Sequence, residues 1–384
     1  MGLGVPGLVV EVELLPPTTI RPEWGEDITR IVRDTMWKYE SKYGLKSVMR
    51  ITPNDVRDMV RPPRMANGVM YDSMMETFQR CALVGADLLA IESTGGKGVH
   101  DDAILTGDLP VALYALSVMG THDMKRLWRD ICQIARETET IPSGDTACGF
   151  GNTAMILADK GYIPRVFAAV IRVITVVRSL VAYEEGAIGP SKDCAYEGPY
   201  IKAITGYPIA MEGKSAACAH LSPLGNIAAA VADLWSNESV QNVKLLSGMA
   251  PTVSMEQLAY DCRLLNAASI QESALKLRDW LVDSDSYLDP QAYVLRPDIV
   301  LMISKRFLKE EGAYARAKVA ALTTIEALKS AVKDGHLRID EREWSWLDNM
   351  QEQVEALPES EGELWMLIKN RVDTSKFVAK DYEL

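Results

Sequence analysis

Three residues with metal-binding side chains stand where buried strands are predicted to end. Glu92 closes an apolar run before Ser-Thr-Gly-Gly, Cys148 follows Asp-Thr-Ala, and Cys194 follows Ser-Lys-Asp. Carboxylate and thiolate are zinc ligands, and a catalytic zinc site keeps three protein ligands and one open position. No CxxC or HExxH motif is present, so such a site would have to be assembled from distant segments. Taken singly, each cysteine is more often a small buried hydrophobe.

The remaining cysteines differ in their surroundings. Cys81, Cys132 and Cys262 lie inside runs with helical spacing, which indicates core residues. Cys218 precedes His220 by two residues and is a reserve ligand. In a large chain without a secretion signal, dispersed cysteines are more often core residues, ligands or nucleophiles than disulfides.

Other polar residues near these positions have more than one possible role. His220 could bind metal or act as an acid, although a structural histidine is the more common case. Asp145 and Asp193 each precede a candidate ligand and could donate a proton, orient the site or cap a loop. Lys97 and Lys214 lie in loops bordered by glycine, where they could meet a cofactor's polar groups or face solvent.

Composition excludes several classes of protein. A net charge of -12 argues against a nucleic-acid-binding protein, which needs a basic surface. The first residues lack the features of a signal peptide. The most apolar stretch, residues 166–183, carries Arg172 and Arg178, so we expect a buried helix rather than a membrane span. The expected location is the cytoplasm.

Strand-like and helix-like segments alternate through the first two-thirds of the chain, which is typical of parallel α/β folds. Short apolar runs predict strands at residues 7–14, 47–51, 87–93 and 208–213. Helical spacing predicts helices at residues 26–43, 71–84, 111–137, 164–183 and 224–234.

The polar residues gather at strand ends, as they do at the catalytic face of a (β/α)₈ barrel. A doubly wound sheet would also place its site there, but no GxGxxG or Walker-type loop supports that alternative. From Ser254 the pattern becomes helical, at residues 255–267, 273–284, 314–333, 340–357 and 361–372. We therefore expect a barrel domain over residues 1–250 that carries the metal site, and a mostly helical extension over residues 251–384 packed on it.

Several long runs resemble the methanol:corrinoid methyltransferase family, the zinc subunit of methanol-utilising systems. The resemblance extends from about Gly7 to the end of the chain. It is carried by IESTGGKGVHDDA (91–103), SGDTACGFGNTAM (143–155), RSLVAYEEGAIGPSKDCAYEG (178–198), KAITGYPIAMEGKSAACAH (202–220), DLWSNESV (233–240) and LAYDCRLLN (258–266).

The resemblance implies a TIM barrel with a helical extension, a zinc ion bound by one Glu and two Cys, and a complex with a small corrinoid protein. The family's Glu precedes Ser-x-Gly-Gly-Lys, which matches Glu92. Its cysteines close Gly-Asp-Thr-x-Cys and Gly-Pro-x-Lys-Asp-Cys, which match Cys148 and Cys194. These are the positions that the strand-end pattern singles out.

Two departures from the family affect the barrel and leave the ligand positions intact. The segment between the two cysteine motifs is a few residues shorter, in the loop before Gly161. Family members also carry a strand–helix unit before the position of Gly7, and this chain begins too late to include it. The resemblance therefore implies a barrel whose first unit is either missing by truncation or rebuilt.

The chemistry that the resemblance implies needs both a Lewis acid and a proton. Hydroxide is a poor leaving group, and zinc stabilises charge on an oxygen. When the methyl group of methanol is transferred, the proton must stay on the methanol oxygen or return to it, because an oxide ion cannot leave. Asp145, Asp193 and His220 are the candidate donors, and Co(I) of the partner's cobamide is the expected nucleophile.

Three alternatives remain open at the level of sequence. The zinc could activate a thiol, as in thiol alkyltransferases, or the methyl donor could be another small methoxy or methyl-thiol compound. The chain could also be a scaffold that binds a corrinoid protein without catalysis. We further expect the chain to form a homo-oligomer or a hetero-oligomer with the corrinoid protein.

Overall fold

A parallel sheet carries Glu92, Asp145 and Cys148 at the carboxyl ends of two neighbouring strands. The computed structural model describes residues 4–192, 196–210 and 250–384. In this part of the chain, four neighbouring strands follow chain order: β1 (Gly7–Glu13), β2 (Lys46–Thr52), β3 (Leu88–Ile91) and β4 (Ile141–Asp145). All three pairings are parallel, and the register of the last pair places Ile91 opposite Asp145. Parallel strands in chain order need crossover connections, which helices provide here.

A second parallel pair lies beside β4. β5 (Ser191–Lys192) pairs with β6 (Ile209–Ala210). The segment before β5 is tied to β4, because Ser143 Oγ donates a hydrogen bond to the Pro190 carbonyl and Ile188 N donates to Pro142 O at 2.9 Å. The predictions of strands at 7–14, 47–51 and 87–93 are confirmed. The strand predicted at 208–213 begins as expected and then leaves the described residues.

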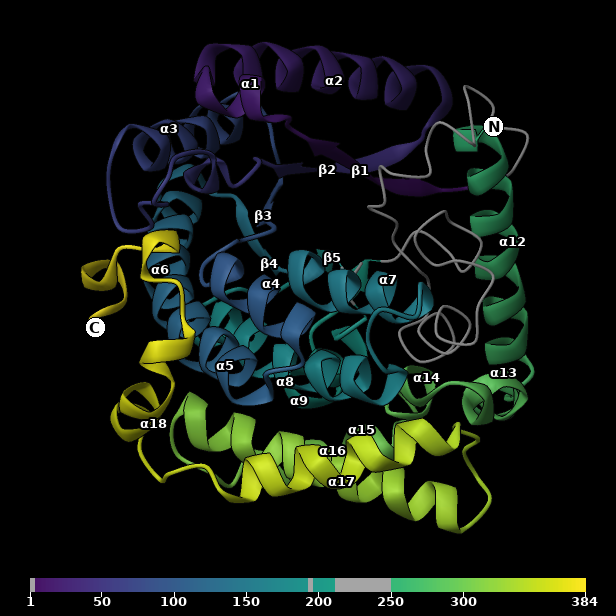
Figure 1. Ribbon diagram of the computed structural model, residues 1–384. Coiled ribbons are helices and arrows are strands. Elements are labelled where there is room, and N and C mark those ends of the chain that lie inside the picture. Colours follow the sequence, from purple (N-terminus) through teal and green to yellow (C-terminus); the bar gives the residue numbers. More distant parts are fainter. Residues whose placement is uncertain (1–3, 193–195, 211–249) are drawn as a thin grey trace.

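Helices cover the outer side of the sheet. In Figure 1, α2 runs along the outside of β1 and β2. The crossovers before β4 contain α1 (Pro16–Ile20), α2 (Pro22–Tyr43), a 3₁₀ turn (Val56–Met59), α3 (Val69–Leu83), α4 (Lys97–Thr106), α5 (Leu109–Tyr114), a π-helical turn (Ala115–Met119) and α6 (Gly120–Thr138). A π-helical turn (Cys148–Asn152), α7 (Thr153–Asp159) and α8 (Arg165–Glu184) lead to β5, and α9 (Gly198–Thr205) leads to β6.

The two faces of the sheet carry different side chains because strand residues alternate. Ile51, Leu89 and Ile91 point outwards and join an apolar cluster with residues of α3 and α6. On the opposite face, buried Arg50 donates to Glu11 Oε2 at 2.7 Å and to Pro190 O at 3.1 Å. This guanidinium therefore bridges β1 and the approach to β5 across the inner side of the sheet.

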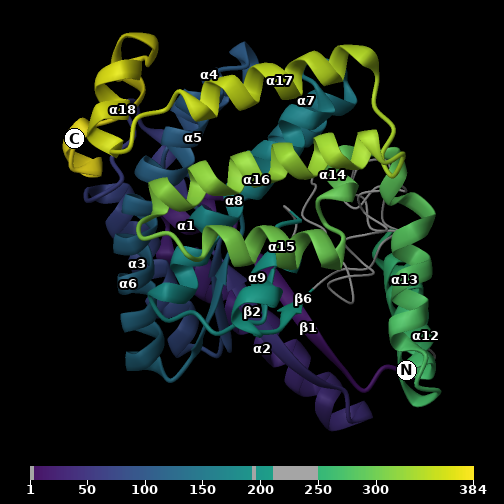
Figure 2. The same ribbon diagram turned by 90° about the horizontal axis from the view of Figure 1, so that it is seen from below.

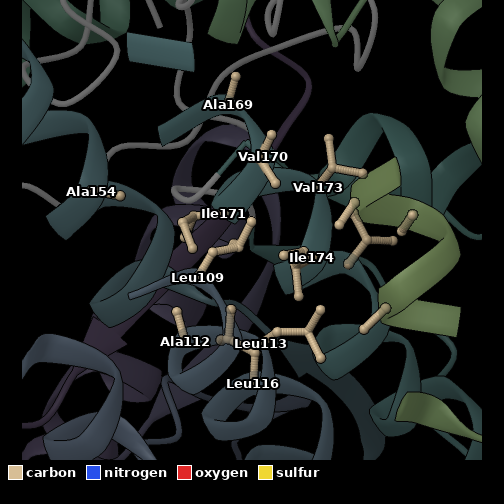
Figure 3. Packing of buried hydrophobic residues seen from close by; sticks show 14 of the residues in the cluster. Leu109, Ala112, Leu113, Leu116, Ala154, Ala169, Val170, Ile171, Val173 and Ile174 are labelled. Carbon is tan, nitrogen blue, oxygen red and sulfur yellow. The ribbon is translucent and has the colours of Figure 1, made fainter. Parts of the chain in front are cut away.

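Helix α8 is the core helix that its apolar sequence predicts. Among the described residues it is the one helix long and apolar enough to cross a membrane, but 94% of that stretch is buried inside the protein. In Figure 3, Ile171 and Ile174 of α8 lie against Leu109, Leu113 and Leu116 from α5 and the following turn. Burial on all sides explains why its sequence has no polar face.

The described chain after residue 250 contains helices and no strand, as expected. Figure 2 shows α15, α16 and α17 lying side by side over α8. The helices are α12 (Ala250–Ile270), α13 (Ala274–Asp285), α14 (Pro290–Tyr293), α15 (Pro297–Phe307), α16 (Ala313–Lys333), α17 (Glu341–Glu355) and α18 (Glu361–Ile368), with 3₁₀ turns at Ser286–Leu288, Lys369–Arg371, Thr374–Lys376 and Ala379–Tyr382. The helix predicted at 224–234 lies outside the described residues.

Candidate metal centre

Two of the three predicted ligands lie at the same edge of the sheet. Glu92 follows the last residue of β3, and Cys148 begins the π-helical turn that follows β4. Because Ile91 and Asp145 are paired across these strands, both side chains start from neighbouring carboxyl ends. Both residues are half-buried. Cys194 comes two residues after β5 in the sequence and lies outside the described residues.

The side chains of Asn152 and Lys97 lie beside the turn that starts at Cys148. Asn152 Nδ2, one turn further along, donates to Cys148 Sγ at 3.4 Å. The aliphatic part of Lys97 packs on the next residue, where a Cβ added to Gly149 would lie 3.3 Å from Lys97 Cε. Asn152 therefore contacts the sulfur directly, and Lys97 packs beside the turn that Cys148 begins.

The cysteines that were predicted to be core residues behave differently. Cys81 in α3 and Cys132 in α6 are buried in apolar surroundings. Burial raises the pKa of each thiol to about 11. A thiol that stays protonated is a poor metal ligand, so the prediction that these two residues fill the core is confirmed. Cys262 in α12 is half-buried, and Cys218 lies outside the described residues.

Asp145 holds the end of β3. Its Oδ2 accepts hydrogen bonds from Ser93 Oγ at 2.6 Å and from Trp128 Nε1 at 3.0 Å, and its Oδ1 accepts from Ser93 N at 3.2 Å. Burial raises the pKa of Asp145 to about 6, although Arg178 and the hydrogen bonds act in the opposite direction. Both carboxylate oxygens are engaged with Ser93, the neighbour of Glu92, so the arrangement suits orientation of the site better than proton donation.

Arg178 reaches the same residue from α8. It is fully buried, and its Nη2 donates to Ser93 O at 2.8 Å and to Ser93 Oγ at 2.7 Å. Its guanidinium also stacks over the Phe150 ring at 4.4 Å. This side chain therefore brings a buried positive charge between the residue after Glu92 and the turn that starts at Cys148.

A buried ion-pair triad fixes the next residue of the loop. Arg57 donates to Asp55 Oδ2 at 2.8 Å and to Asp123 Oδ1 at 2.7 Å, and all three side chains are almost fully buried. Asp55 in turn accepts from Thr94 N at 2.8 Å and from Thr94 Oγ1 at 2.9 Å. Burial disfavours ionisation of Asp55, but Arg57 and the hydrogen bonds lower its pKa below the usual value. The carboxylate thus stays charged and holds Thr94.

Glu197 holds the backbone before Cys148, as Asp145 and Asp55 hold the residues after Glu92. Its Oε1 accepts from Ala147 N at 2.6 Å and from Ser179 Oγ at 2.8 Å. The side chain is buried, and burial raises the pKa of its carboxyl group. The backbone immediately before Cys148 is therefore fixed by a residue from the segment that follows β5.

The position of Lys97 differs from the expectation of a loop. It is the first residue of α4, and its Nζ forms an ion pair with Asp101 one turn further along. The glycines before it are typical of a loop, whereas Gly96 is the N-cap of the helix, with a φ of 81°. Lys214, Asp193 and His220 lie outside the described residues.

The residues present fit part of a zinc site. No group of three or more His, Cys, Asp or Glu side chains that could hold a metal occurs within the described residues. Glu92 and Cys148 supply one carboxylate and one thiol at adjacent strand ends, which are donor types that zinc accepts. A third protein ligand would have to come from the remaining part of the chain.

Sequence reasoning missed the residues that hold the site in place. They come from several elements that local sequence patterns do not connect. These residues are Asp55, Arg57, Ser93, Thr94, Asp123, Trp128, Asn152, Arg178 and Glu197. Arg178 gave a partial signal, because an arginine inside an otherwise apolar helix needs a buried partner.

Comparison with known proteins gives consistent matches. The family model described as "Methanol-cobalamin methyltransferase B subunit" matches residues 1–383. A methanol–corrinoid protein co-methyltransferase of Methanosarcina barkeri (strain Fusaro / DSM 804) is 39% identical over 361 residues, which are 93% of this chain and 78% of that protein. The crystal structure of the methanol:cobalamin methyltransferase complex MtaBC from Methanosarcina barkeri matches with a TM-score of 0.92 and 36% identity, covering 100% of this chain and 84% of the matched chain.

Proposed function

Because this chain belongs to the methanol-cobalamin methyltransferase B subunit family, we propose that it transfers the methyl group of methanol to the cobalt of a corrinoid held by a partner protein. The observation that carries this proposal is the match over nearly the whole chain to a family and to a relative with this activity. The structural relative forms a complex named for both subunits, which supports a small corrinoid protein as the partner.

We propose further that Glu92, Cys148 and Cys194 hold a zinc ion. The adjacent strand ends that carry Glu92 and Cys148 support this assignment, as does the hydrogen bond from Asn152 Nδ2 to Cys148 Sγ. When bound, zinc supplies a Lewis acid that stabilises developing charge on the methanol oxygen. This assignment matches the donor set of catalytic zinc sites, with one position left for substrate.

The chain's own residues then have defined tasks. Ser93, held by Asp145 and Arg178, sets the direction of the Glu92 side chain. Glu197 fixes the backbone before Cys148, and Asn152 donates to its sulfur. Because both carboxylate oxygens of Asp145 accept hydrogen bonds, its proposed role is to orient the site. The proton that must return to the methanol oxygen is then better supplied by Asp193 or His220. Lys97 and Lys214 are the proposed contacts to the cobamide's polar groups.

For the fold, we propose a TIM barrel over residues 1–250 with a helical extension over residues 251–384. Parallel strands in chain order support it, as does the approach of β5 to β4. The hydrogen bond from Arg50 in β2 to the Pro190 carbonyl before β5 spans the inner side of the sheet, which supports a sheet that curves to close into a barrel. We propose a cytoplasmic location, which the burial of α8 inside the protein allows. The same proposal includes assembly as a homo-oligomer or as a hetero-oligomer with the corrinoid protein, and the MtaBC complex favours the second.

The proposal is tested with the purified chain and two ligand variants. We expect about one zinc per chain and methylation of reduced cobalamin when methanol is supplied, with neither in Cys148→Ala or Glu92→Gln. Cys132→Ala is the matched control, because this cysteine is buried in α6 away from the strand ends. Zinc and methyl transfer retained in both ligand variants would refute the metal assignment, whereas no turnover of methanol by the parent protein would refute the reaction.

A further inference from the structure

The residues that follow the 3₁₀ turn Thr374–Lys376 fold back onto the loops at the edge of the sheet. Residues 377–383, which we call the strap, lie against α6 and contain the short 3₁₀ turn Ala379–Tyr382. In Figure 1 the strap is the yellow segment next to α6. Asp381 and Tyr382 in it are buried, with only 7% and 2% of their surface exposed. Buried polar groups need hydrogen-bond partners, and the partners of Asp381 and Tyr382 show which loops the strap contacts.

The first partner belongs to the loop that carries Glu92. Tyr382 OH accepts a hydrogen bond from Gly96 N at 3.1 Å. Gly96 starts α4 without any capping side chain of its own, so the phenol oxygen satisfies one of the free N–H groups that every helix start exposes. The cavity between the strap and this loop measures only about 10 Å³, which leaves room for no more than about one water molecule.

The second partner leads to the same loop by a longer route. Asp381 Oδ2 accepts from Met65 N at 2.7 Å and from Ala66 N at 3.3 Å. Met65 O accepts from Arg57 Nη1 at 2.9 Å, and Arg57 holds Asp55, which holds Thr94. The first route therefore ends at Gly96, four residues after Glu92, and the second route ends at Thr94, two residues after Glu92.

The strap is itself anchored on α6. His122 Nδ1 lies 3.1 Å from Tyr382 O, and Arg126 Nη1 donates to Asp381 O at 3.3 Å. These contacts fix the strap backbone, so that the two side chains point at the loops and not at solvent. A segment that only covered apolar surface would need no such set of polar contacts.

From these contacts we infer that Tyr382 and Asp381 are positioning residues that fix the loop of residues 92–96 and thereby the direction of Glu92. The inference rests on the proposed function, because it gives Glu92 the role of a metal ligand. Groups that orient a ligand are worth about 10–100-fold in metal affinity when removed. The strap thus acts on metal affinity without touching the metal.

The test compares Tyr382→Phe and Asp381→Ala with the parent chain. Zinc affinity is measured by competition with a chromophoric chelator, and amide hydrogen exchange is followed in a peptide covering residues 92–97. We expect zinc to bind about tenfold more weakly in both variants, with faster exchange in this peptide. Asp381→Asn, which keeps an acceptor oxygen, should recover most of the affinity. Lys380→Ala, an exposed residue of the strap, should match the parent.

The outcomes separate this inference from the function on which it rests. Unchanged exchange in residues 92–97, or faster exchange with unchanged zinc affinity, in folded Tyr382→Phe and Asp381→Ala would overturn the positioning role. Equal losses in Asp381→Asn and Asp381→Ala would overturn the role of the acceptor oxygen. A parent chain that binds no zinc would overturn the metal assignment first, and the exchange data would still report whether the strap orders the loop.

Discussion

The two residues that follow Glu92 are held by hydrogen bonds from separate parts of the chain. Ser93 receives hydrogen bonds from Arg178 and gives hydrogen bonds to Asp145, and Thr94 gives two to Asp55. These partners come from β4, α8 and the segment after β2, so the loop is fixed from three sides. A residue that must keep one geometry as a ligand benefits from such support of the backbone beside it.

The protonation of Asp145 leads to a prediction about pH. Burial raises the pKa of Asp145 to about 6 in the folded protein, whereas it is about 3.9 in an unfolded chain. Between these values the folded state binds more protons than the unfolded state, so the free energy of unfolding falls as pH rises. The stabilisation that Asp145 gives the folded state is fully present below about pH 4 and is lost above about pH 6. A difference of two pKa units corresponds to about 3 kcal/mol in the free energy of unfolding.

We therefore expect Asp145→Asn to show a weaker decline of stability between pH 4 and pH 7 than the parent chain. Urea denaturation at several pH values measures this difference. The asparagine also loses charged hydrogen bonds, which lowers stability at every pH and leaves the slope as the informative quantity. Identical slopes in the two proteins would contradict the raised pKa.

At the scale of elements, apolar runs predicted the strands well. Strand β3 is fully buried, the second half of β2 is buried and β1 is mostly half-buried, and buried strands of a parallel sheet read as continuous hydrophobic segments. β4 has the sequence Ile-Pro-Ser-Gly-Asp and was recognised only by the residues that follow it. Its glycine is required by close packing, because a Cβ on Gly144 would lie 2.7 Å from Ser191 Cβ.

The helix α4 was missed for a physical reason. Its start has no side-chain cap and no acidic first turn, and the preceding Gly95 and Gly96 are typical of a turn. The contacts that orient Glu92 and Cys148 were also beyond reach. Arg178 lies 85 residues from Ser93 and Glu197 lies 50 residues from Ala147, and periodicity reports only local structure. The spacing of residues therefore only suggested candidate zinc ligands, and the resemblance to a known family was needed to choose Glu92, Cys148 and Cys194.

The loop between β3 and α4 gives a prediction about packing. A Cβ on Gly95 would lie 2.3 Å from Oδ2 and 2.5 Å from Cβ of Asp123, so the carboxylate would have to move away from Arg57. We expect Gly95→Ala to lower the free energy of unfolding by about 1–3 kcal/mol. Chemical denaturation of the purified variant measures it.

Gly98→Ala is the matched control for this loop. It lies inside α4, where the nearest atom to an added Cβ would be Lys376 Cβ at 3.5 Å, an ordinary contact. Alanine is also favoured over glycine within a helix. We expect stability equal to or above that of the parent chain. A loss as large as that in Gly95→Ala would show that this region resists any added side chain, and the specific role of the Asp123 contact would be wrong.

For the whole molecule, the proposed zinc would join strand ends that the chain reaches at widely separated positions. Glu92 and Cys148 follow adjacent strands, and Cys194 follows β5 in the sequence. A metal bound only by the folded state stabilises it by mass action, by about 4 kcal/mol when free metal exceeds the dissociation constant about a thousandfold. The sheet edge would then depend on metal for its stability as well as for its chemistry.

Removal of metal should therefore lower the thermal unfolding midpoint of the parent chain by several degrees, and added zinc should restore it. Cys148→Ala should unfold near the midpoint of the metal-free parent and show no response to chelator or zinc, because its site lacks a thiolate. Cys132→Ala should respond as the parent does. Differential scanning calorimetry with and without chelator measures these shifts. A parent chain whose midpoint ignores the chelator, or a Cys148→Ala variant that responds fully to zinc, would mean that these strand ends do not share a metal.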